Sequence, residues 1–338
     1  MYSFILGIDI SKATLDGALL SCENKESILY FKAENNPEGL EKLFNLCLKV
    51  QGFTIEKCLI CIEATGVYCY PILNYATKVD AVIWMESATR IKKSMGIQRG
   101  KNDKIDAQRI AIYASRHQQD ARIWRPVSKT VTQVKHLSAL RDRLLDTRNR
   151  LNTPMEEFKQ VGDADTYKLV KKAMKKSLTS IDKDITKLDI QLKNIIENDE
   201  HLNELFSLVT SVVGVGSQTA LALIVCTDGF KLFDDPRKLA CYAGVVPFEY
   251  SSGTSVKGKT RVSKMANNKL KTMLHMAALS AVRFDHQLKQ YYERKIAEGK
   301  KKMSILNSVK NKLLHRIMSV VTRKEKYENS VNFSLISS

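Results

Sequence analysis

The chain has 338 residues, 44% of them hydrophobic, and carries 54 lysines and arginines against 36 aspartates and glutamates, a formal net charge of +18. This length and composition predict two or three domains with hydrophobic cores and exclude an intrinsically disordered chain. So large a positive surplus favours a polyanionic partner, most often nucleic acid, and the alternative is general solubilising charge.

Hydrophobic runs and cysteines indicate the compartment. No apolar run reaches the ~20 residues that span a bilayer, so we expect no membrane association. The first ten residues, MYSFILGIDI, have no basic leader and are interrupted by Asp9, which argues against a secretory signal. The seven cysteines are scattered, and the pair Cys58 and Cys61 lies in an apolar stretch with no second pair to complete a zinc site. We therefore expect reduced cysteines and a cytoplasmic, nucleoid-associated protein.

Short apolar stretches dominate the first part of the chain and predict β-strands at 3–9, 16–22, 27–33, 57–63 and 80–86. Helical periodicity predicts helices at 37–50, near 69–78 and from Asp103 onward, the last preceded by a basic loop. The predicted elements follow the order of the ribonuclease-H-like α/β fold, which is three strands, a helix, a strand, a helix, a strand and a helix. We predict such a domain over residues 1–122.

The middle of the chain, 127–204, reads as helical. Leucine, isoleucine and valine recur there at spacings of three and four, with an interruption expected at Asn152-Thr153-Pro154. The pattern predicts two antiparallel helices or an intermolecular coiled coil. For the first of these segments, one amphipathic helix on a globular core is the alternative.

Residues 205–322 predict a mainly helical C-terminal domain, with polar loops joining helices from 227 to 282. Gly214-Val215-Gly216 lies between two apolar helical stretches. It is either a helix-hairpin-helix turn whose amides receive a backbone phosphate or a plain tight turn. Residues 323–338 are expected to form a flexible tail.

Acidic residues in this basic chain form a candidate metal site. Asp103 and Asp106 share one face of a helix, and Asp9 and Glu63 each end a predicted strand. Two carboxylates about 4 Å apart repel by about 4 kcal/mol at an effective dielectric of about 20, so the set favours a divalent cation. Oxygen ligands select Mg²⁺, with Mn²⁺ as the substitute. The alternative for the helical pair is an N-cap, Asp103, followed by a first-turn charge. The basic residues expected to hold a nucleic-acid backbone beside this site are Lys92, Lys93, Arg99 and Lys101.

A second candidate site is the serine-rich stretch around Ser251-Ser252-Gly253. A serine there could attack a phosphate, with cations stabilising the developing charge. Those cations are Lys257, Lys259, Arg261 and Lys264. No histidine lies nearby in sequence to activate a serine, so from the residues alone a loop that only contacts phosphates is the simpler interpretation.

Several segments together resemble the DEDD transposases of the insertion sequence 110 family, relatives of the Piv DNA invertase. They are GIDISKATLDGAL, CIEATGVYCYPI, NDKIDA at 102–107, GVG at 214–216 and LACYAGVVPFEYSSGTSVKGKTRVSK. The resemblance implies a RuvC-like N-terminal domain whose Asp9, Glu63, Asp103 and Asp106 bind Mg²⁺. It also implies a C-terminal transposase domain with a catalytic serine. Ser252 matches that position, with Ser251 and Ser255 close enough to keep the register open.

The resemblance further implies a recombinase that cuts and rejoins DNA through a covalent serine–phosphate intermediate. A bridge RNA would pair with donor and target DNA, and the protein would work as a tetramer built from dimers. Two other functions compete with this one. A metal-dependent, structure-selective endonuclease would use water instead of serine, and a non-catalytic nucleic-acid scaffold would be expected to lack one of the acids.

Overall fold

The structure is a computed structural model that describes residues 1–24, 26–96, 102–252, 256–262 and 266–328, with the backbone alone described for 248–252 and 256–261. Arg99, Lys101, Ser255, Lys264 and tail residues 329–338 lie outside the described residues. The chain divides into two compact units, residues 1–126 and 127–338. The finer division of the second unit at residue 204 stays a prediction.

A mixed five-stranded sheet forms the centre of the first unit. Its strands are β1 (Phe4–Ile10), β2 (Thr14–Ser21), β3 (Ser27–Glu34), β4 (Cys58–Glu63) and β5 (Val82–Glu86). The order across the sheet is β3-β2-β1-β4-β5. Strand β2 is antiparallel to both of its neighbours, β1 and β3, and β4 and β5 are parallel to β1. The predicted strands and their order along the chain are confirmed.

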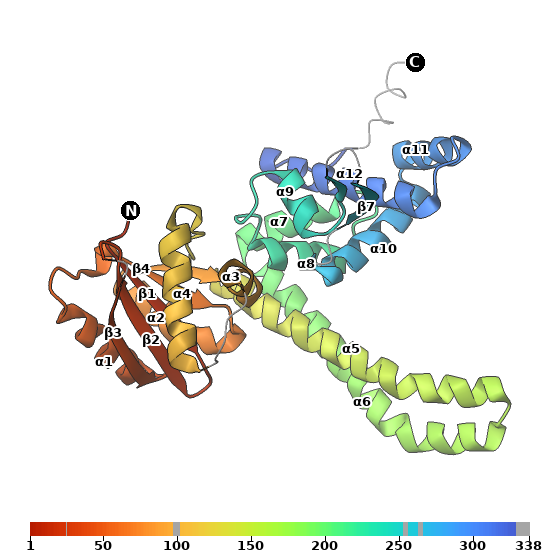
Figure 1. Cartoon of the computed structure of the whole chain (residues 1–338). Helices are drawn as coiled ribbons and strands as arrows, with labels where there is room; N and C mark the ends of the chain where they lie inside the picture. The colour runs from red at the N-terminus through yellow and green to blue at the C-terminus, as the bar shows by residue number, and fades with distance from the viewer. Residues whose placement is uncertain (25, 97–101, 253–255, 263–265, 329–338) are drawn as a thin grey trace. The chain divides into compact units, whose positions relative to one another are not determined.

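Helices cover both faces of this sheet. Helices α1 (Pro37–Leu48) and α2 (Tyr70–Lys78) pack on one face, where Leu40 and Ile72 join a core with Ile8. Helices α3 (Ala88–Met95) and α4 (Asp103–His117) pack on the other, and α4 lies across the strands (Figure 1). Short 3₁₀ turns connect these elements at Ile55–Lys57, Gly66–Cys69 and Gln118–Asp120.

Helix α3 replaces the first part of the basic loop expected between 90 and 101. Ser87 caps it by accepting a hydrogen bond from the Arg90 N–H at 3.4 Å, and Ile91 is its one buried residue. One cap and one apolar anchor are enough for a two-turn helix, but they are too weak a pattern to predict it.

Two long antiparallel helices, α5 (Lys129–Val161) and α6 (Ala164–Glu197), open the second unit (Figure 1). Arg141 and Arg148 of α5 pair with Asp189 and Asp182 of α6, each at 2.6 Å. The interruption expected at 152–154 is wrong, because α5 continues through Pro154. Proline removes one backbone hydrogen bond and costs a helix interior about 3 kcal/mol, but α5 has 33 residues whose remaining bonds and packing outweigh that cost. The turn comes instead at Gly162, whose φ of +83° suits glycine. A coiled coil with another chain stays a prediction.

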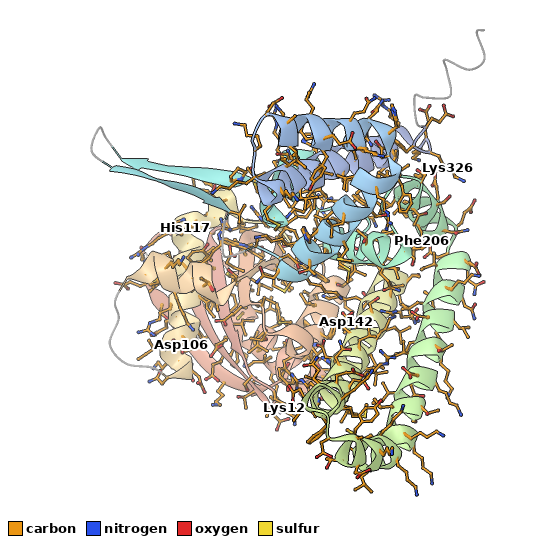
Figure 2. All side chains as sticks on the ribbon, turned by 90° about the vertical axis from the view of Figure 1, so that its right-hand side faces the viewer. Lys12, Asp106, His117, Asp142, Phe206 and Lys326 are labelled. Atoms are coloured by element: carbon orange, nitrogen blue, oxygen red, sulfur yellow. The ribbon has the colours of Figure 1, made fainter. Side chains whose placement is uncertain are left out.

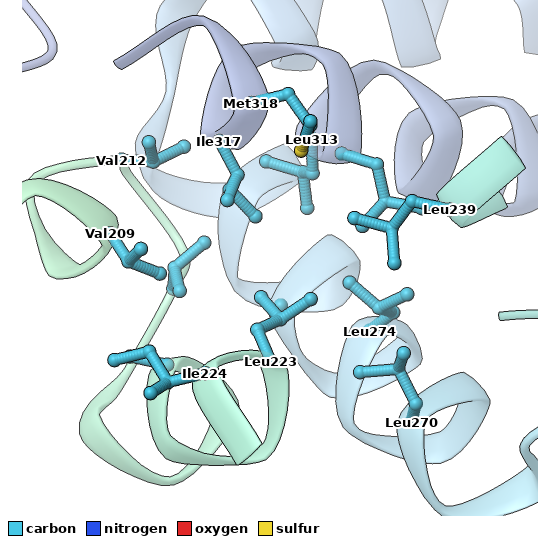
Figure 3. Packing of buried hydrophobic residues seen from close by; sticks show 14 of the residues in the cluster. Val209, Val212, Leu223, Ile224, Leu239, Leu270, Leu274, Leu313, Ile317 and Met318 are labelled. Carbon is cyan, nitrogen blue, oxygen red and sulfur yellow. The ribbon is translucent and has the colours of Figure 1, made fainter. Parts of the chain in front are cut away.

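A helical bundle with one β-hairpin completes this unit. Its helices are α7 (Glu200–Thr210), α8 (Ser217–Thr227), α9 (Pro236–Tyr242), α10 (Asn268–Phe284), α11 (His286–Ala297) and α12 (Lys302–Arg323). Leu223, Leu274 and Ile317 are fully buried in its core (Figure 3). Strands β6 (Pro247–Ser252) and β7 (Val256–Val262) correct the expectation of only helices and loops between 227 and 282.

The glycine turn between α7 and α8 is a packing feature. Gly214 has a φ of +94°, and a Cβ there would lie 2.7 Å from the Ala277 carbonyl oxygen of α10. The contact gives Gly214 a packing role, and phosphate binding by the amides of this turn stays a prediction.

After α12 the chain turns back, and the Tyr327 N–H donates to the Ser211 hydroxyl at 2.8 Å. In the described part of the chain, every helix is too short or too polar to cross a bilayer.

Candidate active site

A row of ionisable residues crosses the five-stranded sheet at the level of Asp9. Asp9 pairs with Asp16 of β2, and Asp16 pairs with Lys32 of β3. On the other side the pair Ile8–Ile62 places Glu63 beside Asp9, and Glu63 pairs with Glu86 of β5. Residues paired across neighbouring strands point to the same face of a sheet. All five side chains of the row therefore share one face.

That face is the one covered by α4, and Gly7 brings the helix close. A Cβ on Gly7 would lie 2.3 Å from the Ala111 backbone nitrogen and 2.5 Å from the Ala107 carbonyl oxygen. Gly7 and Asp9 are two apart on β1, so they face the same way. The helix backbone thus rests directly on the strand, and its first turn reaches the level of Asp9.

Neither aspartate at the beginning of α4 serves as the cap of that helix. Asn102 is the N-cap, accepting the Ile105 N–H at 2.8 Å, so the alternative of Asp103 as the cap is wrong. Asp106 lies in the first turn, and His117 ends the same helix (Figure 2). Asp106 accepts a hydrogen bond from Arg109 at 3.0 Å.

Electrostatics shows that the predicted acids share one environment. Removal from water, together with the negative charges of neighbouring carboxylates, raises the pKa of Asp9 from 3.8 to about 6. In order of effect these are Asp106, Glu63, Asp103 and Asp16. Of the four acids predicted from sequence, Asp9 is the one whose pKa is raised, and the other three are among the charges that raise it.

Within the row, Asp16 and Glu86 have partners in the described part of the chain that compensate their charge, whereas the central Asp9 and Glu63 do not. Tyr30 donates its hydroxyl to Asp16 at 2.5 Å, and the Lys32 ammonium lies 3.5 Å from Asp16 and 3.8 Å from Asp103. The hydrogen bond to Asp16 raises the pKa of Tyr30 to about 12, so the phenol keeps its proton.

At the other end, Glu86 accepts from the Ser87 N–H at 2.8 Å, from Arg90 at 3.1 Å and from Tyr113 at 3.3 Å. Within the described residues, the carboxylates of Asp9 and Glu63 have no comparable hydrogen bond or ion pair. The uncompensated charge is therefore concentrated in the middle of the row.

Sequence reasoning missed the buried Asp16 and its partner Lys32. The signal was present: if the strands predicted at 3–9 and 16–22 are joined by a tight turn, Asp9 and Asp16 lie opposite each other, as they do in the structure. Asp16 is 3% exposed. A buried carboxylate next to the expected site needs its own counter-charge, and Lys32 supplies it.

The donors at this face suit a hard divalent cation, because all are carboxylate oxygens. Among the described residues, however, no three carboxylate, imidazole or thiol groups stand close enough around one point to ligate an ion as their side chains are placed. The fold brings the four acids to one face and one electrostatic environment. It does not arrange them as a closed coordination shell.

The serine candidates lie on the hairpin of the second unit. Ser252 ends β6 and pairs through its backbone with Val256, and Ser251 pairs with Lys257. Lys257, Lys259 and Arg261 belong to β7. Of the basic residues predicted beside the acids, Lys92 and Lys93 are exposed on α3.

Comparison with known proteins gives consistent relatives. The "Transposase IS116/IS110/IS902 family" model matches residues 206–293, and a model of IS110-type DEDD transposases matches residues 6–158. The chain is 25% identical over 332 residues to the pilin gene-inverting protein of Moraxella bovis, covering 97% of this chain and 98% of that one. It is 27% identical over 261 residues to the transposase for insertion sequence element IS1111A of Coxiella burnetii, covering 68% and 69%. Among solved structures, RuvC of T. thermophilus in complex with a Holliday junction substrate aligns over 36% of this chain and all of its own, at 10% identity and a TM-score of 0.29.

Proposed function

Since the chain belongs to the IS116/IS110/IS902 family of transposases, it is a DNA-processing enzyme, and we propose that it cuts and rejoins DNA through a covalent serine–phosphate link. The observation that carries the catalytic part of this proposal is the convergence of acids on Asp9. Their charges and burial raise its pKa to about 6.

Asp9, Glu63, Asp103 and Asp106 would hold Mg²⁺, with Mn²⁺ as the substitute. Carboxylates that repel one another are stabilised by a divalent cation. When bound, such an ion supplies Lewis-acid stabilisation of charge on phosphate oxygens. Tyr30 and Lys32 compensate the charge of Asp16, and the hydrogen bonds to Glu86 compensate that carboxylate, so the ligand candidates are the other four acids.

Ser252 is proposed as the nucleophile. Its hydroxyl oxygen would form a bond to phosphorus while the bond to the deoxyribose oxygen breaks, and the serine proton would pass to that leaving oxygen through a base or water. Attack by a DNA hydroxyl on the serine–phosphate ester would reverse the exchange and rejoin the strand. The main-chain pairing of Ser252 at the end of β6 supports a defined position for it.

Lysines and arginines near each candidate site are proposed to contact the DNA backbone. Near the serine these are Lys257, Lys259, Arg261 and Lys264, and near the acids they are Lys92, Lys93, Arg99 and Lys101. Phosphate contacts of this kind position a nucleic acid without reading its sequence. Sequence selection would come from a bridge RNA that pairs with donor and target DNA, as the family resemblance implies, in a tetramer built from dimers. The net charge of +18 supports binding of both polyanions.

A covalent-adduct assay tests the serine. Labelled DNA carrying the sequences that flank the gene, with RNA transcribed from the same flank and Mg²⁺, is incubated with protein and separated on a denaturing gel. The unmodified chain should yield DNA attached to protein, and Ser252→Ala should bind DNA but yield none. Ser251→Ala and Ser255→Ala are the matched controls and should still form the adduct.

The same gel separates the competing function. If Ser252→Ala still cuts DNA, and the unmodified chain releases cut DNA free of protein, the enzyme is a metal-dependent endonuclease that uses water. An adduct that persists in Ser252→Ala but disappears in Ser251→Ala or Ser255→Ala would move the nucleophile to that neighbouring serine.

A further inference from the structure

The distal half of α6, next to the turn at Gly162, has a solvent face made of lysines. Five exposed lysines recur at the helical spacings of three and four: Lys168, Lys171, Lys172, Lys175 and Lys176. Side chains at such spacings lie on one face of a helix. From residue 166 to residue 181 the sequence has no aspartate or glutamate. This part of the helix therefore presents one sign of charge.

The apolar residues of α6 place that face away from α5. Val170, Met174 and Leu178 are partly buried, and Ile185, Leu188 and Leu192 continue the same stripe as fully buried residues. At 3.6 residues per turn, the lysines project from the side of the helix opposite this apolar stripe. They are therefore on the solvent side, opposite the contact with α5.

The proximal half of α6 has equally exposed lysines, but each has acidic neighbours. Lys187 pairs with Asp184 at 3.6 Å and Lys193 pairs with Glu197 at 3.7 Å. Lys183 lies between Asp182 and Asp184 in sequence. Charge on this half is balanced, as on an ordinary solvated helix.

The distal lysines have few such partners. Lys168 is 3.9 Å from Asp165, and the Lys171 ammonium lies 5.3 Å from the centre of the Tyr167 ring. Within the described part of the chain, Lys172, Lys175 and Lys176 have no ion pair. Like charges at these spacings destabilise a helix, so solubility alone would be served better by the mixed pattern of the proximal half.

We propose that the lysine face of α6, Lys168 to Lys176, binds the phosphate backbone of a nucleic-acid duplex. At 1.5 Å per residue the face extends about 12 Å. A duplex carries one phosphate charge per about 1.7 Å of its axis, so about seven phosphates lie along that length. Lysine is a flexible point charge, which suits contact with phosphates rather than recognition of bases. This binding site does not depend on the serine chemistry.

Two triple variants within one helix test the proposal. The distal variant is Lys172→Gln, Lys175→Gln and Lys176→Gln, and the proximal control is Lys183→Gln, Lys187→Gln and Lys193→Gln. Each removes three charges, and glutamine resembles lysine in helix propensity, so both should retain the helical content of the full chain. Equilibrium binding to a short DNA duplex and to an RNA duplex of equal length is measured from 50 to 200 mM salt.

Each phosphate that a lysine neutralises contributes about 0.9 to the magnitude of the slope of log K against log salt for B-DNA. The distal variant should therefore lower that slope by up to about 2.7 and weaken binding at 0.1 M salt by at least about tenfold. The proximal control should bind within about twofold of the unmodified chain, since its lysines are neutralised by acids. Lys172→Arg, Lys175→Arg and Lys176→Arg should restore affinity.

Loss on both duplexes would identify a general backbone site, and loss on DNA alone or RNA alone would identify the polymer it serves. Equal loss in the distal and proximal variants would overturn the proposal, because net charge rather than this face would then govern binding. Unchanged affinity and salt slope in the distal variant would overturn it as well.

Discussion

Replacing Asp9 with asparagine should make the metal-free protein more stable. Asparagine keeps the shape of the aspartate and removes the charge that Asp106, Glu63 and Asp103 repel. Burial and those charges raise the pKa of Asp9 from 3.8 to about 6 in the folded protein. At about 1.36 kcal/mol per pKa unit the penalty for the ionised form approaches 3 kcal/mol. Partial exposure to solvent reduces this to about 1–2 kcal/mol.

The pH dependence of this effect has a defined sign. A raised folded-state pKa means that the contribution of Asp9 to stability is greatest below pH 3.8 and is lost as the pH rises through about 6. The difference between Asp9→Asn and the unmodified chain should therefore be small near pH 4 and full above pH 7. It should amount to a Tm increase of about 4–8 °C, since about 1 kcal/mol shifts the Tm of a unit of this size by about 4 °C.

Thermal unfolding with EDTA and with excess Mg²⁺ measures both parts of the prediction. With EDTA at pH 7.5, Asp9→Asn should unfold at the higher temperature. Mg²⁺ should raise the Tm of the unmodified chain and leave the variant nearly unchanged. Asp120→Asn, an exposed aspartate of the same unit, is the control and should match the unmodified chain. A lower Tm for Asp9→Asn in EDTA, or an equal response of both proteins to Mg²⁺, would refute the reasoning.

Two further changes test how the site is built. Gly7→Ala places a methyl group 2.3–2.5 Å from the α4 backbone, so it should lower the free energy of unfolding by about 1–3 kcal/mol and weaken the Mg²⁺-dependent rise in Tm; denaturant unfolding with unchanged stability would contradict this contact. Lys32→Met leaves the buried Asp16 without its ammonium partner and should cost about 1–3 kcal/mol. Adding Asp16→Asn should recover part of that loss in a double-mutant cycle, whereas strictly additive losses would show that the pair is not coupled.

Local patterns were sufficient for much of the fold. The five strands and the helices α1, α2 and α4 each have a hydrophobic repeat and turn residues within a short window, so each could be placed from its own sequence. Helix α3 and the β6–β7 hairpin could not, since one has a single buried residue and the other is short and rich in lysine and serine. Pro154 misled the prediction because an interior proline either kinks or ends a helix, and α5 continues through it.

The residues of the candidate site likewise include some that local sequence predicts and some that it does not. Asp9, Glu63, Asp103 and Asp106 were identified by residue type and by their places at the ends of predicted elements. Asp16 was passed over because it lies inside a strand and has no motif of its own. Its role follows from its pairing with Asp9 and from the contacts of Tyr30 and Lys32.

By itself, the sequence determined the strand and helix order of the first unit, the acidic and serine candidates, and the family. It also contained the lysine spacing of α6, because helical periodicity is a local property. Only the tertiary structure decided that Lys32, Asp16, Asp9, Glu63 and Glu86 form one row, and that α4 rests on Gly7 to bring its aspartates to that row. Strand register and helix packing join residues that are far apart along the chain, and no local pattern specifies which of them meet.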